Sequence, residues 1–248
     1  MLIKHANSLR LAAISLVAVL AAACDSNGGN GNGGGQPMPP AVTTATFEVT
    51  VTNLTNAQPL SPIAVIAHQN SFPVFTIGEP ASPGLEALAE GGDNTALLAE
   101  ANAVAGIGDT ASGAAPIGPA GSETVSLSMD ANTLGLMTVS VSTMLVNTND
   151  AITGVNAVPL GDLQVGDSIS MPGIAYDAGT EANTESAAHI PGPAGGGEGF
   201  NAARDDIADR VAMHPGVVGQ DGGFASSDLN GQHRFDNPVA QITIERIN

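Results

Sequence analysis

Hydrophobic and polar residues alternate along several short segments, which is the pattern of a half-buried β-strand. The clearest example is TFEVTVTN at residues 46–53, where Phe47, Val49 and Val51 share one face while threonine and glutamate occupy the other. The same alternation recurs in two further segments, residues 123–130 and 239–247. We therefore predict three strands with one apolar face each.

Two other segments are nearly continuous apolar runs. Residues 63–68, IAVIAH, are short enough for a buried strand. Residues 136–146, LMTVSVSTMLV, carry apolar side chains on both faces and predict a central strand of the sheet. Clusters of Gly, Pro, Asn and Asp separate these segments and predict turns.

Helical spacing is confined to three stretches. Leucines recur about one helical turn apart in residues 84–92 and 95–104, and a pair of glycines would end the first helix. We expect a third helix after residue 201, because Ile207 and Val211 lie four apart and a proline follows soon afterwards. Many short strands with few helices favour an all-β sandwich over a doubly wound α/β sheet.

The N-terminal residues have the pattern of an export signal. Residues 1–10 are cationic and polar, and residues 11–23 form an apolar run that is too short to cross a bilayer. Three alanines stand directly before Cys24, which is the only cysteine. This arrangement resembles a bacterial lipoprotein cleavage site, so we expect a lipid on Cys24. The alternative is plain secretion with a free thiol.

These patterns divide the chain into three parts. We predict a lipoprotein signal peptide at residues 1–23, then a lipidated cysteine and a flexible linker rich in Gly and Pro at residues 24–43, and a globular domain at residues 44–248. The expected location is the cell envelope outside the cytoplasm, at the outer membrane or cell surface rather than the inner membrane. One cysteine excludes an internal disulfide, so burial of the core, aided by a metal, must hold the fold together.

The charge of the chain excludes one class of partner. The chain has 24 acidic and six basic side chains, which gives a formal net charge of −18. Such a surface repels phosphate backbones, so we expect no nucleic-acid partner. It also repels anionic lipid, so any contact with the membrane must come from the lipid on Cys24. We expect a monomer.

Five segments together resemble the spondin domain in its bacterial form. They are FEVTVTNLTNAQPLSP, FTIGEPASPGLEALAEGGD, MLVNTNDAITGVNAVPL, YDAGTEANTE and NPVAQITIERI. They occur in family order from about residue 46 to residue 248. The resemblance implies an antiparallel β-sandwich related to C2 domains, with a calcium ion bound by acidic residues in loops at one end.

The resemblance also implies the calcium ligands. The first maps to Asp150 in NTNDAITGVN, and the other two map to Asp177 and Glu181 in DAGTE. This chain departs from the family in having Ala151 after the first ligand, Glu181 where the family has aspartate, and none of the cysteines of animal spondins. The residue types suit the ion, because calcium prefers several oxygen ligands from loops and Gly179 lets the chain turn between the two acids.

The alternative interpretation of these acids is structural. In a chain with 24 acidic residues some carboxylates meet by chance, and aspartate at the start of a loop often forms a turn or cap instead of binding metal. We expect the flanking polar residues to be solvated turn residues without a primary role. They are Asn147, Asn149, Asn156, Asn183 and Glu185.

No other catalytic or metal-binding pattern stands out. The histidines form no HExxH motif and no pair four residues apart, so we expect no zinc. We expect His68 to be packed or at a strand edge, and His214 to mark the end of the third helix. Serine catalysis lacks a GxSxG turn, and the thiol is assigned to the lipid.

The sequence therefore predicts a lipid-anchored, calcium-binding spondin-like module for adhesion or recognition, without catalysis. Its protein or glycan ligand is not specified by the sequence. Two alternatives come from other classes of protein. One is an envelope enzyme that acts on glycans through paired carboxylates in a cleft. The other is a purely structural envelope lipoprotein.

Overall fold

The structure is a computed structural model that describes residues 43–69, 72–206 and 208–248. The predicted signal peptide, Cys24 with its lipid, and all but the last residue of the predicted linker lie outside the described residues. In the part that is described, no helix has the length and apolar character needed to cross a membrane.

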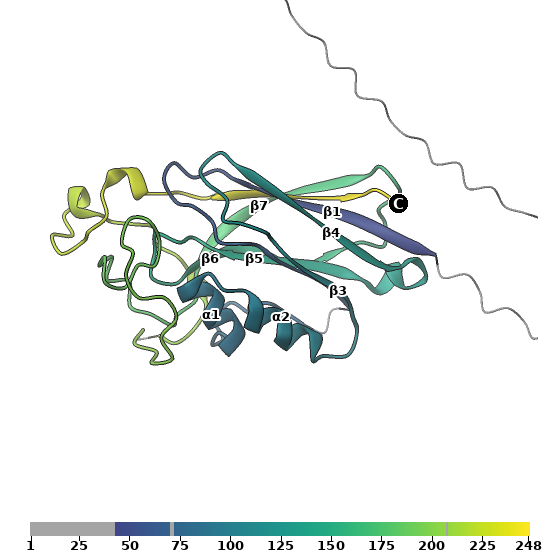
Figure 1. The fold of residues 1–248 in the computed structure, drawn as a ribbon, viewed down its shortest axis with the longest axis horizontal. Helices are drawn as coiled ribbons and strands as arrows, with labels where there is room; N and C mark the ends of the chain where they lie inside the picture. The colour runs from purple at the N-terminus through teal and green to yellow at the C-terminus, as the bar shows by residue number, and fades with distance from the viewer. Residues whose placement is uncertain (1–42, 70–71, 207) are drawn as a thin grey trace, which may run out of the picture. The chain divides into compact units, whose positions relative to one another are not determined.

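Strands make up most of the regular structure (Figure 1). The described strands are β1 (Thr44–Asn53), β2 (Ala64–His68), β3 (Ile107–Ser112), β4 (Ser122–Asp130), β5 (Thr138–Met144), β6 (Ala151–Pro159), β7 (Ser168–Asp177), β8 (Ala212–Met213) and β9 (Ala240–Arg246). The described helices are α1 (Pro83–Gly91), α2 (Thr95–Asn102) and the short 3-10 helices η1 (Ala131–Leu136), η2 (Gln220–Gly222) and η3 (Gly231–His233).

All neighbouring strands in this part of the chain run antiparallel in the order β3-β2-β5-β6-β7-β9-β1-β4, and β8 pairs with β7. β7 joins the two halves of the sheet. Its first half, Ser168 to Gly173, pairs with β9, and its second half, Ile174 to Asp177, pairs with β6. The sheet therefore changes layer along a single strand.

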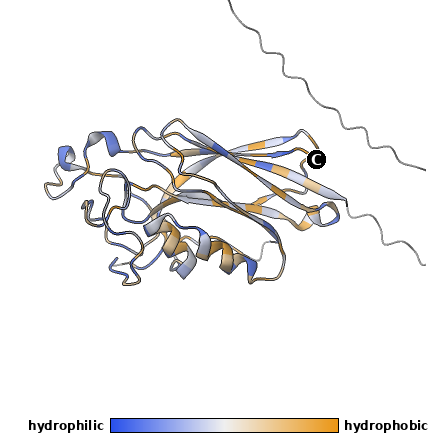
Figure 2. Cartoon of the chain, in the orientation of Figure 1, coloured by the Kyte–Doolittle hydropathy of each residue, from blue (hydrophilic) through white to orange (hydrophobic). Residues whose placement is uncertain are grey.

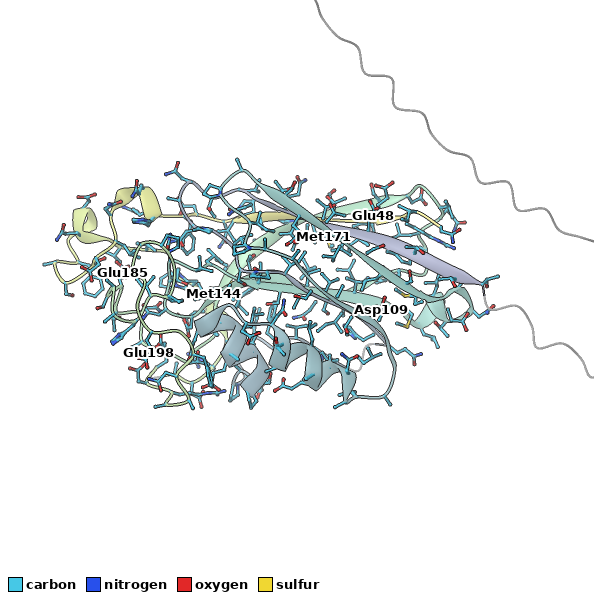
Figure 3. The ribbon with its side chains drawn as sticks, in the orientation of Figure 1. Glu48, Asp109, Met144, Met171, Glu185 and Glu198 are labelled. Carbon is cyan, nitrogen blue, oxygen red and sulfur yellow. The ribbon has the colours of Figure 1, made fainter. Side chains whose placement is uncertain are left out.

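The two ends of this strand order approach each other. The backbone N–H of Ser128 in β4 donates to Oδ2 of Asp109 in β3 at 2.8 Å, so a carboxylate bridges the seam between the outer strands. Figure 3 labels Asp109 at this seam. The sheet is thus nearly closed and barrel-like. The predicted all-β class with a few short helices is confirmed, and the C2-like sandwich stays a prediction.

The main core lies between the two layers of the sheet. Phe47, Val49 and Val51 of β1 are fully buried there, while Glu48 on the other face is exposed. The predicted alternation in β1, β4 and β9 is confirmed, since each turns one row of apolar side chains inward.

A second apolar cluster lies between the sheet and the helices α1 and α2; its sheet members are Ala64 and Ile66 of β2 and Ile152 of β6, and α1 also contacts β5. Leu85, Leu88 and Leu97 are its largest helical members and are fully buried. Figure 2 shows hydrophobic residues along both helices. Because the helices cover one face of the half-sheet and the main core covers the other, β5 is buried on both faces. The predicted central strand and the first two predicted helices are confirmed.

The third predicted helix is wrong. Residues 201–206 and 208–210 form bends and irregular backbone, and β8 begins at Ala212. Side chains of Asn201 and Asp206 accept hydrogen bonds from the backbone N–H groups of Ala203 and Ala208, and these short turns compete with the helical bond pattern. His214 therefore ends no helix. β3, β6 and β7 were not predicted as strands. Gly154 lies within β6, and Pro172 and Gly173 lie within β7, so these residues break the apolar pattern in the sequence although both strands are continuous.

Candidate functional site

Strand pairing brings Asp150 and Asp177 to the same end of the sheet. Ala151, the first residue of β6, pairs with Asp177, the last residue of β7, and the backbone N–H of Ala178 donates to the carbonyl of Asp150 at 3.2 Å. Long loops gather at this end, opposite the C-terminus (Figure 1). The β6–β7 hairpin therefore accounts for the convergence of residues that are far apart in the sequence.

The carboxylate of Asp150 is fully buried. Its Oδ2 accepts hydrogen bonds from the backbone N–H groups of Thr180 at 2.8 Å and Glu181 at 3.1 Å, and from the Thr180 hydroxyl at 3.3 Å. Its Oδ1 has no hydrogen-bond partner. Burial, and then the charge of Asp177, raise the pKa of Asp150 to about 7. Near neutral pH such a group is stabilised by a proton or by a bound cation.

Asp177 is buried next to Asp150 and is held by its own loop. Its Oδ1 accepts from the backbone N–H of Gly179 at 2.8 Å, and its Oδ2 accepts from the side-chain amide of Asn183 at 2.5 Å. Gly179 has a φ of 72°, a left-handed conformation that suits glycine, so its predicted role in the turn is confirmed. Burial raises the pKa of Asp177.

Glu181 is also buried, and its Oε2 accepts from the side-chain amide of Asn149 at 3.3 Å. Burial, followed by the charges of Glu90 and Asp150, raises the pKa of Glu181 to about 7. The structure therefore places all three predicted ligands in one buried, electrostatically connected group of carboxylates.

The flanking polar residues are not solvated, contrary to the prediction. Asn147, Asn149 and Glu185 are buried. The Glu185 carboxylate accepts hydrogen bonds from the backbone N–H groups of Val218 and Gly219 and from the Ser227 hydroxyl, at 2.6 to 2.8 Å. Figure 3 shows Glu185 among these loops. The loops lack the backbone hydrogen bonds that strands make with each other. Their buried backbone N–H groups bond to these side chains instead, which explains why the side chains are buried.

Asn156 and Asn183 are half-buried and bonded as well. Asn156 donates to the carbonyl of Phe75 at 2.9 Å, and Oδ1 of Asn183 lies 3.2 Å from Nε2 of His214. His68 is buried with its Nε2 2.8 Å from Oγ of Ser140, so its packed position is confirmed.

One carboxylate oxygen of the acidic group is free to bind a cation, but the acidic side chains alone do not form a complete metal site. Among the described residues, no group of three or more His, Cys, Asp or Glu side chains is arranged to hold a metal ion. The free Oδ1 of Asp150 nevertheless fits a hard cation, which prefers oxygen ligands and also accepts backbone carbonyls and water. A cation here would use the three predicted acids together with such neutral oxygens.

Sequence reasoning missed two contributors to this group. Glu90 in α1 is buried, and its charge raises the pKa of Glu181. Asp206 raises the pKa of both Asp150 and Asp177. No signal in the sequence pointed to Glu90, whereas Asp206 was assigned to a helix that does not form.

A cavity with a volume of about 490 Å³ lies where β6 and β7 separate. Its lining is mostly apolar, with Phe75, Met171 and Tyr176 among its residues, and it contains no carboxylate. Figure 3 labels Met171 on β7. This cavity is therefore separate from the acidic group.

A family model described as Spondin_N matches residues 52–191. The matched residues contain Asp150, Asp177 and Glu181 and extend from the end of β1 past β7. No curated protein matches the chain.

Proposed function

The chain belongs to the spondin N-terminal domain family, and from this premise we propose that it is an extracytoplasmic recognition or adhesion module that binds calcium and is anchored by a lipid on Cys24. The family supports an extracellular module of this kind. The proposal includes no catalytic step. Its partner is a protein or glycan, because the net charge of −18 disfavours nucleic acid.

The observation that carries the calcium proposal is the free Oδ1 of Asp150. This oxygen belongs to a fully buried carboxylate, yet it has no hydrogen-bond partner. An unpartnered charged oxygen inside a protein is costly, and a cation removes that cost. The neighbouring carboxylates of Asp177 and Glu181 add negative charge at the same end of the sheet.

In this proposal the ion connects the start of β6 with the loop that follows β7. Asp150 would supply a ligand from one side, and Asp177 and Glu181 would supply ligands from the other. An ion that binds only the folded chain stabilises it by about 2.7 kcal/mol when its concentration is a hundredfold above Kd. It would also order the surrounding loops, which form the end of the domain best suited to contact a partner.

Thermal unfolding with calcium and with a chelator tests this proposal. We expect calcium to raise Tm by several degrees, and we expect Asp150→Asn to lose most of this increase. Asp162→Asn is the matched control, because Asp162 is exposed in the β6–β7 connection at the opposite end of the hairpin. An unchanged Tm at millimolar calcium, or an equal loss in both variants, would contradict the proposal.

A further inference from the structure

An apolar surface extends across β7 where the sheet divides into its two layers. The cavity of about 490 Å³, which we call the larger cavity, and a smaller cavity of about 310 Å³ share Met171 and Pro172 in their linings. β7 pairs with β9 up to Gly173 and with β6 only from Ile174 onward. The part of β6 after Gly154 therefore has no described strand on this side, and the larger cavity fills the gap.

Exposed apolar side chains surround the two cavities. Ile77 lines the larger cavity and is 59% exposed, and Leu54 lines the smaller cavity and is 49% exposed. Met213 is 55% exposed and pairs with Tyr176, which places both side chains on the same face of the sheet. Exposed apolar side chains that gather around a hollow mark an interaction surface, whereas single ones need no explanation.

The wall of the larger cavity is held in place by bonds within the domain. The rings of Phe75 and Tyr176 pack with their centroids 4.8 Å apart, and both line the cavity. The side chain of Asn156 accepts from one backbone N–H of residues 74–75 at 3.0 Å and donates to one of their carbonyls at 2.9 Å. A cavity that is already ordered costs little conformational entropy when a partner binds.

The lining selects a neutral apolar group. It contains no Asp, Glu, Lys, Arg or His. Thr76 and Tyr176 contribute one hydroxyl each, whereas both polar groups of the Asn156 side chain already bond to backbone. A sugar would bury more hydroxyl groups than these side chains can bond, and buried polar groups without partners are costly. A large aromatic or aliphatic side chain fits better, because the flexible Met171 can adapt to its shape.

The charge of the domain indicates what surrounds that apolar group on the partner. The chain has 24 acidic and six basic side chains, and Glu79 is exposed only two residues after Ile77. Such a surface attracts basic partners and repels acidic ones. Complementary charge around a neutral pocket speeds association and rejects the wrong partners. The fitting partner therefore carries Lys or Arg beside one protruding apolar side chain.

We propose that this surface binds a protein partner through one large apolar side chain, which enters the larger cavity, and through basic residues that flank it. This inference rests on the proposed recognition function and narrows its partner from a protein or glycan to a protein. A few aromatic or apolar anchors in pockets supply most of the binding energy of protein interfaces. The smaller cavity, on the other side of Met171, receives the part of the partner next to the anchor.

Nuclear magnetic resonance of methionine methyl groups measures whether the larger cavity is occupied. The probe is the pentapeptide Gly-Lys-Trp-Lys-Gly with both ends blocked. The protein is the chain from residue 24 onward with Cys24→Ser, because this form needs no detergent that could itself enter an apolar cavity. Met171 lines the cavity, whereas Met144 is fully buried and does not line it; Figure 3 labels both. We expect the peptide to shift the Met171 methyl signal and to leave that of Met144 unchanged.

Changes in the probe separate the anchor from the charge. Alanine in place of tryptophan removes the anchor and should weaken binding by about tenfold or more. Glutamate in place of both lysines keeps the anchor but reverses the charge, so it should weaken binding more at low salt than at high salt. The glycan probe is a tetrasaccharide of β-1,4-linked N-acetylglucosamine, and we expect it to leave the Met171 signal unchanged.

Ile77→Lys tests the rim of the larger cavity, because it removes an apolar contact and adds a charge that repels the peptide. Val165→Lys is the matched control, since Val165 is 62% exposed between β6 and β7 and lines neither cavity. We expect Ile77→Lys to weaken peptide binding by about tenfold or more. Val165→Lys should change it by less than about twofold. Both side chains are exposed, so both variants should fold, and melting curves check this.

The outcomes distinguish this inference from the proposed function. A Met171 shift that Ile77→Lys reduces and Val165→Lys retains supports the inference. An unchanged Met171 signal at millimolar peptide, equal losses in the two variants, or equal binding of the alanine peptide overturns it. A Met171 shift caused only by the tetrasaccharide also overturns it, but leaves a recognition module whose partner is a glycan. The calcium proposal is tested separately through the Tm of Asp150→Asn.

Discussion

Two buried groups near the end of β7 respond to burial in opposite directions. Burial raises the pKa of Asp150 to about 7 and lowers the pKa of His214 to about 4. The cause is the same for both, because low polarity disfavours the charged form of an acid and of a base. The region therefore favours neutral side chains unless a counter-ion enters.

The hydrogen bonds of His214 fit the neutral ring. Its Nδ1 accepts from the backbone N–H of Gly216 at 2.9 Å, which leaves Nε2 to donate to Asn183 at 3.2 Å. The Phe235 ring lies beside it with centroids 5.3 Å apart. Glu185 opposes the shift only partly, since its charge raises the pKa of His214 while burial lowers it.

We predict that His214 lowers the free energy of unfolding of the protein in acid. The unfolded histidine binds a proton below its ordinary value of 6.5, whereas the folded one binds it only near 4, so stability falls as pH decreases between these values. The contribution is about 3 kcal/mol. Denaturation of the wild type and His214→Gln at pH 7 and pH 4 measures it. Both chains carry the same acidic residues, so the difference between them removes the contribution of the carboxylates to the pH dependence. Parallel pH profiles would refute the assignment of this pH dependence to His214.

At the residue scale, the sequence predicted the acidic site residues but not the burial of the polar residues around them. The positions of Asp150, Asp177 and Glu181 were obtained from the resemblance to the family, and the structure groups them at one end of the sheet. The burial of Asn149 and Glu185 was not obtained, because a polar residue in a loop has the same local pattern whether water or a backbone N–H is its partner.

At the element scale, the helices that formed are those with an apolar face to bury. In α1, Leu85 and Leu88 are buried in one apolar cluster with Ile66 of β2 and Ile152 of β6, and Ser82 caps the first turn by accepting from the N–H of Leu85 at 3.1 Å. The expected helix after residue 201 has fewer apolar positions, and its acidic and amide side chains bond to nearby backbone instead. Helical spacing of apolar residues alone did not distinguish the segments that form helices from the segment after residue 201 that does not.

We predict that Leu88→Ala lowers the free energy of unfolding by about 2–5 kcal/mol, because it leaves a cavity between α1 and the sheet. Leu98→Ala in α2 is the matched control, since Leu98 is only partly buried and should cost less. Chemical denaturation in chelator measures both values without a contribution from calcium. Equal losses would contradict the expectation that the deeper burial of Leu88 contributes more to the stability of the fold than Leu98 does.

At the scale of the whole molecule, the strong negative charge and the proposed anchor act together. A chain with a net charge of −18 is repelled by an anionic membrane surface, so in the proposed arrangement the lipid on Cys24 supplies the attachment. A single acyl chain binds a membrane weakly, whereas a lipidated N-terminal cysteine with several chains holds it firmly.

We predict that Cys24→Ser moves the protein from the membrane fraction to the soluble extracytoplasmic fraction. The reason is that this change removes the only thiol to which the lipid can be attached. Fractionation followed by detection of the domain measures the distribution, and an unchanged melting curve shows that the fold is retained. A variant that stays with the membrane would contradict the proposed anchor.

The sequence by itself determined the class of fold and the strands with one apolar face, because side-chain alternation is a local property that each segment carries alone. β1, β4 and β9 follow it closely. Only the tertiary structure decided how β7 joins the two layers, how Glu90 comes near Glu181, and how Asp206 comes near Asp150. Such proximity depends on contacts between residues far apart in the chain, which no local pattern in the sequence carries.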